Sequence, residues 1–213
     1  MIDKLKNLSG QTKIFIGISA LVLVLDQITK YWAVMRLTDA FHTANGSPLS
    51  VGEKFSRFLF SKHPNREGMV TVVEDFWHFR YVENPGAAWG FLADSADWFR
   101  TPFFVIVSIL AMGFILVYFH KSEPGQRILR VALALVFGGA VGNFIDRIRL
   151  SYVIDFIDWH YYREFTWPTF NVADMGISIG VGLLIVDMFV YKPEGESADA
   201  KGGGSASKAK SKA

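Results

Sequence analysis

Long apolar runs, separated by polar segments, dominate the pattern of this 213-residue chain. A helix needs about 20 mostly apolar residues to cross the hydrocarbon core of a bilayer. Four runs have that length, over residues 14–34, 99–119, 128–145 and 172–191. The pattern therefore predicts an α-helical integral membrane protein with four transmembrane helices, in a single domain over residues 1–191.

The distribution of basic residues predicts how these spans are oriented. With four spans, both termini lie on one side of the membrane. Residues 1–13, 120–130 and 192–213 carry eleven Lys and Arg in 46 residues, a higher density than in the segments on the other side. The positive-inside rule places this basic side in the cytoplasm. All six Trp then fall near the outer face, where an interfacial aromatic belt is expected.

The outer region, residues 36–98, contains two kinds of sequence. Residues 42–68 are polar and contain several Gly and Pro, so we expect a solvated insertion there. Val70 to Glu83 is rich in β-branched and aromatic residues, which predicts a small β-rich cradle between the first and second spans. Residues 192–213 are rich in Gly, Ser, Ala and Lys and predict a disordered cytoplasmic tail.

Composition excludes several classes of protein. Hydrophobic residues make up 51% of the chain and charged residues 20%, which is unlike a disordered chain or an ordinary soluble domain. The absence of Cys excludes thiolate nucleophiles, disulfides and Cys-bound metal centres. The net charge is +2 and the basic residues are scattered, so no face for nucleic acid is expected.

Ionisable side chains within the apolar spans are candidates for function, because each costs roughly 2.5 to 3.5 kcal/mol at mid-membrane. Asp26 and Lys30 lie one helical turn apart, which favours a structural acid-base pair over direct chemistry. Other polar residues from the third span, the fourth span and the segment between them fall at one depth, just below the outer interface. They are Asn143, Asp146, Arg147, Asp155, Asn171 and Asp174.

Asp155 and Asp174 are the best candidates for acid-base chemistry. Each lies in an apolar segment, and neither has a basic neighbour within four residues. Two carboxylates in one apolar site cannot both ionise at low cost, so the pair can hold a single proton. One member then activates water while the other protonates a carbonyl oxygen, without a metal or cofactor. Asp146 precedes Arg147 directly, which suits a structural ion pair better.

Two functions from other classes are compatible with the same residues. One is a metal-dependent membrane hydrolase or transferase, whose oxygen and nitrogen ligands would be Asp155, Asp158, His160 and Asp174. The other is a small ion or proton transporter, since Asp and Lys within helices also mark ion pathways. A transporter needs a polar path across both leaflets, whereas the inner halves of these spans are apolar apart from Asp187.

Five blocks of sequence occur in order between Asp26 and Phe189. They are Asp26-Gln-Ile-Thr-Lys30, Asn84-Pro-Gly-Ala-Ala88, Gly138-Gly-Ala-Val-Gly-Asn-Phe-Ile-Asp-Arg147, Val153-Ile-Asp-Phe156 and Phe170-Asn-Val-Ala-Asp174. Together, on four matching spans, they resemble the lipoprotein signal peptidases, also called type II signal peptidases. The resemblance implies an intramembrane aspartyl endopeptidase of the bacterial inner membrane, with its active site at the periplasmic face.

The resemblance also implies a substrate and a set of site residues. The substrates are prolipoproteins whose lipobox Cys carries a diacylglyceryl group, and cleavage occurs on the amino side of that Cys. Globomycin-like peptides are expected to occupy the same site. The catalytic pair maps onto Asp155 and Asp174. The residues that line or support the site are Asp26, Lys30, Asn84, Gly86, Ala87, Asn143, Asp146, Arg147 and Asn171.

The remaining expectations concern partners and departures from the family. We expect a monomer that uses no cofactor or metal and whose partners are prolipoproteins and membrane lipids. Trp89 stands where the family usually has Phe. Residues 42–68 form an insertion that the family commonly lacks, and a solvated loop is the favoured interpretation of it.

Overall fold

The computed structural model describes residues 2–62, 68–86, 91–123, 125–162 and 164–191, with only the backbone of residues 2–9. Five helices lie within these ranges: α1 (Ile2–Leu37), α2 (Val51–Phe60), α3 (Asp97–Lys121), α4 (Arg127–Leu150) and α5 (Val172–Val190). Four strands accompany them: β1 (Met69–Val73), β2 (Trp77–Asn84), β3 (Val153–Tyr161) and β4 (Phe165–Thr166). The predicted tail, residues 192–213, lies outside the described residues.

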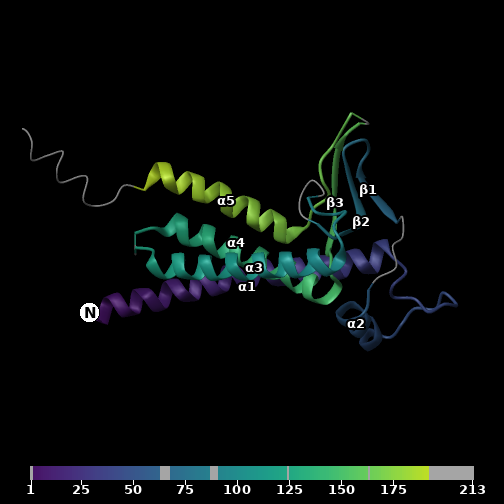
Figure 1. The fold of residues 1–213 in the computed structure, drawn as a ribbon, viewed down its shortest axis with the longest axis horizontal. Helices are drawn as coiled ribbons and strands as arrows, with labels where there is room; N and C mark the ends of the chain where they lie inside the picture. Colours follow the sequence, from purple (N-terminus) through teal and green to yellow (C-terminus); the bar gives the residue numbers. More distant parts are fainter. Residues whose placement is uncertain (1, 63–67, 87–90, 124, 163, 192–213) are drawn as a thin grey trace, which may run out of the picture.

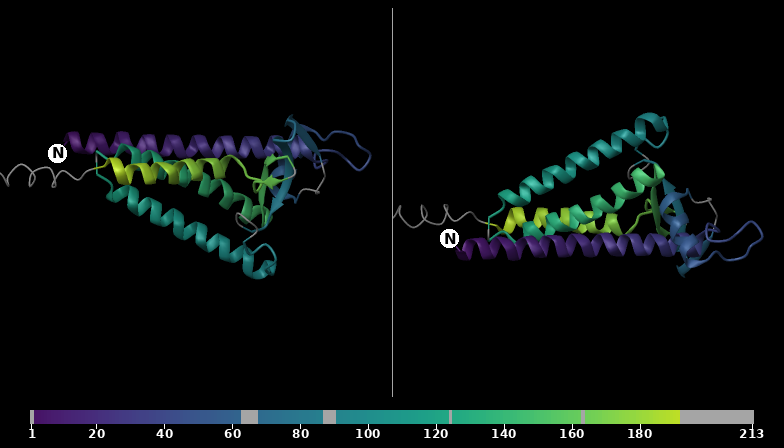
Figure 2. Two further views of the ribbon diagram at one scale, coloured as in Figure 1. Left: turned by 90° about the horizontal axis from the view of Figure 1, so that it is seen from above. Right: turned by 90° about the horizontal axis from the view of Figure 1, so that it is seen from below.

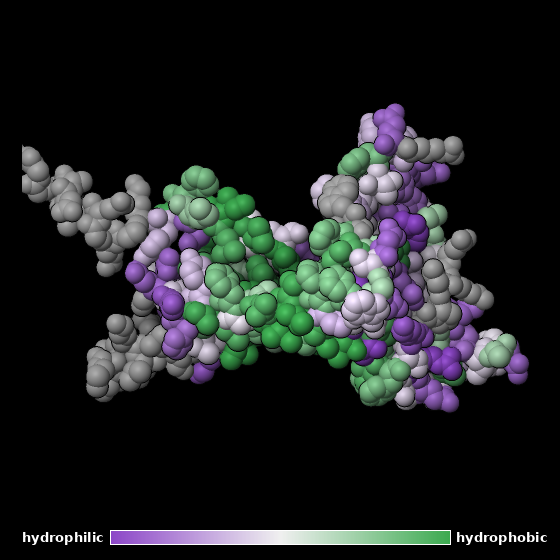
Figure 3. Space-filling model, viewed as in Figure 1, coloured by the Kyte–Doolittle hydropathy of each residue, from purple (hydrophilic) through white to green (hydrophobic). Residues whose placement is uncertain are grey.

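The four long helices confirm the predicted membrane spans. Residues Gly10–Leu37, Asp97–Lys121, Arg127–Leu150 and Val172–Val190 are each long and apolar enough to cross a bilayer. Their hydrophobic surface forms a band between two polar ends of the molecule (Figure 3). Helix α4 continues five residues past its predicted end at residue 145, and charged side chains in this last part are paired, Asp146 with Lys30 on α1 and Arg149 with Asp146.

The long helices run along a common direction, with the sheet at one end of the bundle (Figure 1). The start of α1 and the end of α5 lie together at the opposite end. Helix α3 diverges from the other three towards the sheet, as both perpendicular views show (Figure 2). Near the other end it is held by Phe119, whose ring centroid lies 4.3 Å from that of Phe15 on α1. The side of the membrane on which the termini lie stays a prediction.

The sheet is antiparallel, with the strand order β1-β2-β3-β4. Strands β1 and β2 confirm the strands expected between residues 70 and 83. The cradle is not built only from the segment between the first two spans, however, because β3 and β4 come from the segment between α4 and α5. The apolar run Val153–Ile157 pairs with β2, which places Asp155 opposite Val82.

A short helix, α2, occupies part of the predicted insertion. The sequence predicts a solvated loop over residues 42–68, but residues Val51–Phe60 are helical. Ser50 and Glu53 form a capping box at the start of α2. Phe58 is buried, and the Arg149 guanidinium lies 4.4 Å from the centroid of its ring. The end of α4 thus anchors this helix; residues 63–67 of the insertion lie outside the described part.

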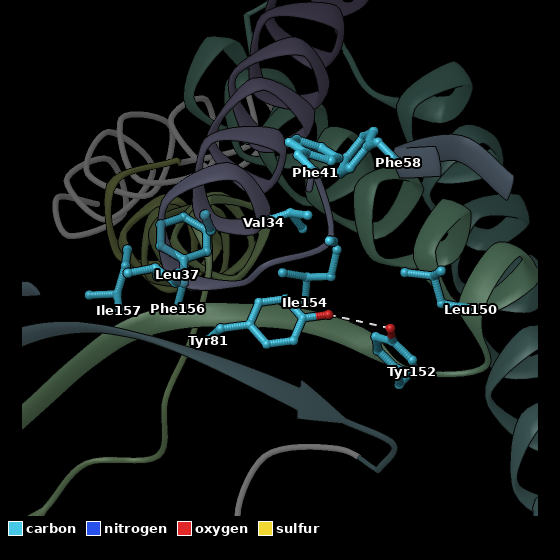
Figure 4. Close-up of a cluster of buried hydrophobic side chains, with 12 residues drawn as sticks. Val34, Leu37, Phe41, Phe58, Tyr81, Leu150, Tyr152, Ile154, Phe156 and Ile157 are labelled. Carbon is cyan, nitrogen blue, oxygen red and sulfur yellow. Dashed lines mark hydrogen bonds between the residues drawn. The ribbon is translucent and has the colours of Figure 1, made fainter. Parts of the chain in front are cut away.

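A buried apolar cluster joins the sheet to the ends of α1 and α4 (Figure 4). It contains Leu37 from α1, Leu150 from α4 and Ile154 from β3, none more than 1% exposed. The hydroxyls of Tyr81 and Tyr152 lie 3.3 Å apart at its edge. Burial of so much apolar surface fixes the sheet relative to the helices.

Glycines allow α4 and α5 to approach closely. A Cβ added at Gly180 would lie 2.8 Å from the backbone oxygen of Ala132 on α4. At Gly139 an added Cβ would lie 2.3 Å from the oxygen of Ala173 on α5. These glycines therefore serve the packing of α4 against α5.

Gly180→Ala is expected to destabilise the protein, because the added methyl group has no space between α4 and α5. Overpacking of this kind costs about 1–3 kcal/mol, and the unfolding temperature in detergent should fall. The matched control is Gly182→Ala on the same helix, where an added Cβ meets nothing within 4 Å. Equal unfolding temperatures for the two variants would contradict the proposed close contact.

Candidate active site

A buried ion cluster centres on Lys30, at the sheet end of the bundle. Its Nζ lies 2.9 Å from Oδ2 of Asp26, 2.8 Å from Oδ2 of Asp146 and 3.0 Å from Oδ1 of Asn143. The side chains of Lys30 and of both carboxylates have no exposed area. Oδ1 of Asp26 accepts a hydrogen bond from the Ala173 backbone at 3.1 Å. The predicted Asp26–Lys30 pair therefore forms, and the cluster joins α1, α4 and α5.

The expected ion pair between Asp146 and Arg147 is not formed. Asp146 pairs with Lys30 and with Arg149, whose Nη2 lies 3.3 Å from its Oδ1. Its Oδ2 also accepts a hydrogen bond from the Ile154 backbone at 3.2 Å, which ties α4 to β3. Consecutive side chains of a helix project about 100° apart, so Arg147 faces elsewhere.

Arg147 is placed at the site. Its Nη2 donates to the carbonyl oxygen of Gly86 at 3.2 Å, and its guanidinium lies 5.0 Å from the ring centroid of Phe104 on α3. The Gly86 amide donates to Oδ1 of Asn84 at 3.1 Å. A Cβ at position 86 would lie 2.5 Å from the Phe91 oxygen, so this turn requires glycine. Ala87, also predicted to line the site, and Trp89 lie outside the described residues.

Asp155 reaches the site from β3 and is 1% exposed. Its Oδ2 accepts a hydrogen bond from Asn84 at 2.9 Å, and its Oδ1 accepts one from Asn171 at 2.7 Å. Burial, followed by the nearby negative charge of Asp174, raises the pKa of Asp155 to about 8. This carboxyl can therefore hold a proton at neutral pH.

Asp174 lies in the first turn of α5, where it forms a capping box with Asn171. The Asp174 amide donates to Oδ1 of Asn171 at 3.0 Å, and the Asn171 amide donates to Oδ2 of Asp174 at 3.2 Å. Oδ1 of Asp174 accepts a further bond from Asn143 at 2.7 Å. The capping box explains where the Asp174 carboxylate lies. The residue is only partly buried, so Asp174 remains available for chemistry.

The two carboxylates are linked through a pair of asparagine amides. Nδ2 of Asn171 donates to Asp155 and, at 3.2 Å, to Oδ1 of Asn143. That same Asn143 oxygen accepts from Lys30, while its Nδ2 donates to Asp174. The orientation of both amides is thus set by the buried lysine, and the amides in turn orient the two carboxylates.

Asp155 and Asp174 both line a cavity of about 640 Å³ between the sheet, α3, α4 and α5. Its walls are largely apolar. Helix α3, which diverges from the bundle on this side (Figure 2), contributes Val107, Ser108 and Ala111. These residues were not identified from the sequence, because small and apolar residues in a span carry no signal of function. The cavity can receive an apolar chain with a polar bond beside the carboxylates.

The four ligands of the alternative metal centre do not form one cluster. Among the described residues, Asp158 and His160 group with His78, and neither Asp155 nor Asp174 belongs to that group. Successive side chains of a strand point to opposite faces, so Asp155 lies on the opposite face of β3 from Asp158 and His160.

Comparisons with known proteins agree on one family. The family described as signal peptidase (SPase) II matches residues 18–190. A lipoprotein signal peptidase of Anaeromyxobacter sp. (strain Fw109-5) is 46% identical over 169 residues, covering 78% of this chain and 79% of that protein. Another, of Geobacter sulfurreducens, is 49% identical over 119 residues, covering 56% and 72% respectively. A solved bacterial membrane enzyme is similar with a TM-score of 0.60 at 29% identity, over 83% of this chain and 87% of its own.

Lys30→Met is expected to destabilise the protein strongly, because it leaves the buried Asp26 carboxylate without a counterion and leaves Asp146 with Arg149 alone. Breaking a buried pair in this way costs about 3–5 kcal/mol. Asp26→Asn should cost less, since Lys30 keeps Asp146 and the amide oxygen can still accept from Ala173. Unfolding temperatures in detergent measure both effects. Lys13→Met, on an exposed part of the same helix, is the control; an equal loss in all three variants would refute the role of the cluster.

Proposed function

The chain belongs to the signal peptidase II family, and from that premise we propose that it removes the signal peptides of prolipoproteins with Asp155 and Asp174 as an aspartyl dyad. The observation that carries the proposal is that both carboxylates face one apolar cavity and are joined through Asn171 and Asn143. Of the described residues expected to support this dyad, Asn84, Asn143 and Asn171 donate hydrogen bonds to it. Family membership favours this activity over a metal-dependent hydrolase or a transporter.

In the proposed reaction the dyad shares one proton, and we assign it to Asp155. Burial beside a second carboxylate favours the protonated form of Asp155 at neutral pH. Asp174 lies at the amino end of α5, where amide donors and the helix dipole complement a negative charge. Asp174 takes a proton from water as the water oxygen attacks the scissile carbonyl, and Asp155 donates its proton to the carbonyl oxygen. As the tetrahedral intermediate collapses, the C–N bond breaks, Asp174 gives its proton to the leaving nitrogen, and Asp155 recovers a proton from a hydroxyl of the intermediate.

The cavity suits a substrate that carries a lipid. We infer that the substrate is a prolipoprotein with a diacylglyceryl group on its lipobox Cys and that the bond on the amino side of this Cys is cleaved. Transfer of acyl chains from water into the bilayer contributes about 0.8 kcal/mol per CH₂ group, so the lipid keeps the substrate in the membrane, where it can reach the cavity. The apolar walls from α3 and α5 would receive it. Globomycin-like peptides would compete for the same space.

The position of the site suggests how the enzyme lies in the membrane. The dyad lies at the sheet end of the bundle, where the hydrophobic band meets a polar end (Figure 3). We propose that this end faces the periplasm of a bacterial inner membrane and that both termini are cytoplasmic. We also propose that the protein acts as a monomer. Cleavage would then occur at the outer interface without extraction of the lipid.

Asp155→Asn and Asp174→Asn are each expected to abolish cleavage while the protein still folds, because neither variant can exchange a proton at the reacting bond. The measurement is the gel shift of a lipid-modified prolipoprotein with purified enzyme, with and without globomycin. Asp75→Asn is the matched control, since Asp75 is an exposed turn residue with φ of 56°, which Asn also tolerates. Near-normal turnover by either dyad variant would rule out the assigned mechanism.

Turnover is expected to decline on the alkaline side as pH rises through about 8, because Asp155 then loses the proton that it must donate. The direction follows from the raised pKa: the protonated carboxyl is present below that pH and is lost above it. Values of kcat/KM between pH 6 and 10 measure the effect, because they report ionisations of the enzyme without bound substrate. A rate that stays constant across this range would argue against Asp155 as the proton donor.

A further inference from the structure

We propose that His78, Asp158 and His160 bind one divalent transition-metal ion, of which Zn²⁺ is the representative, at a site on the sheet that is separate from the catalytic dyad. The ion would stabilise the sheet and take no part in peptide cleavage. The proposal therefore does not depend on the identity of the catalytic residues.

Strand pairing brings the three side chains together. His78 on β2 lies opposite Asp158 on β3, and His160 follows two positions along β3 on the same face. One potential ligand atom from each residue lies within 4.8 Å of the other two. The two imidazole rings are stacked, with centroids 4.5 Å apart and an angle of 11° between their planes.

The site contains a buried polar atom with no partner. His78 is 7% exposed, and its Nδ1 makes no hydrogen bond to any described residue. A buried nitrogen without a hydrogen-bond partner is energetically unfavourable. A metal ion would satisfy this nitrogen, because a neutral imidazole offers a lone pair as a ligand.

The carboxylate of Asp158 is also incompletely compensated. Asp158 is 6% exposed. The nearest basic nitrogens given by the structure are Nη2 of Arg80, 3.5 Å from its Oδ1, and Nδ1 of His160, 3.9 Å from its Oδ2. Both separations are long for a charged hydrogen bond. Arg80 would orient the carboxylate through Oδ1, as an outer partner of a metal ligand does, and Oδ2 would bind the ion.

The ligand set favours a transition metal over Ca²⁺ or Mg²⁺. Two imidazoles and one carboxylate are a common set for zinc, with ligand distances of about 2.0–2.2 Å. Tetrahedral geometry at that distance places the ligand atoms about 3.4 Å apart. The ligand atoms now lie within 4.8 Å of one another, and small rotations of the three side chains would bring them to the shorter distance. A water molecule would take the fourth coordination position.

The location of the ion indicates its effect. It would join β2 to β3, the strands that carry Asn84 and Asp155 to the cavity. Binding to the folded state alone raises its stability through mass action. Zinc should therefore raise the unfolding temperature of the enzyme, while cleavage continues in excess chelator.

The test uses the full chain in detergent, purified without a histidine tag and stripped with chelator. Equilibrium dialysis against Zn²⁺ should give one bound ion per chain, and the unfolding temperature should rise with zinc. His160→Gln and His78→Gln should each weaken zinc binding at least tenfold and remove the thermal shift. His120→Gln is the matched control, because His120 is exposed in the last turn of α3.

A spectroscopic measurement on the unmodified chain covers the case in which a variant fails to fold. Co²⁺ bound by two imidazoles and a carboxylate should give visible absorption bands that added Zn²⁺ abolishes. The proposal is overturned if the wild-type chain binds no stoichiometric zinc and gives no cobalt spectrum, or if folded His78 and His160 variants bind zinc as tightly as the wild type. Loss of cleavage in chelator would contradict the separation of this ion from catalysis.

Discussion

The arrangement of the site depends on the contacts of the buried Lys30 ammonium group. An apolar helix bundle cannot hold an uncompensated charge, so Lys30 requires the carboxylates of Asp26 and Asp146 beside it. This requirement brings together helices that are distant in sequence. Because Lys30 also donates to Asn143, the same cluster sets the orientation of an amide that contacts Asp174. Structural support and the geometry of the proposed dyad are thus parts of one hydrogen-bonded network.

The two proposed catalytic carboxylates come from different kinds of element. Asp155 is carried by a strand and Asp174 by the first turn of a helix. Their relative position depends on the apolar cluster that packs the sheet against α1 and α4 (Figure 4). Asn171 completes the arrangement, since its side chain caps α5 and also contacts Asp155. One residue therefore serves helix initiation and the alignment of the pair.

The separation of α3 from the rest of the bundle matters for an enzyme that acts on lipid-bearing chains. At the end away from the sheet, aromatic packing between Phe15 and Phe119 holds this helix. Towards the sheet it diverges, and small or apolar side chains line the cavity beside the carboxylates. An apolar substrate already in the membrane could approach such a site laterally, with little exposure of its acyl chains to water.

From hydropathy alone the four spans can be predicted, and the polar residues within them stand out as candidates for a site, because charges in a lipid environment are too costly to be incidental. The sequence also separated Asp155 and Asp174 from the other acids, since neither has a basic neighbour in the chain. The pairing of Asp146 with Lys30 and the place of β3 in the sheet are apparent only in the folded chain. The same holds for the position of His78 opposite Asp158. These contacts join residues that are distant along the chain, and hydropathy and local spacing do not encode such pairings.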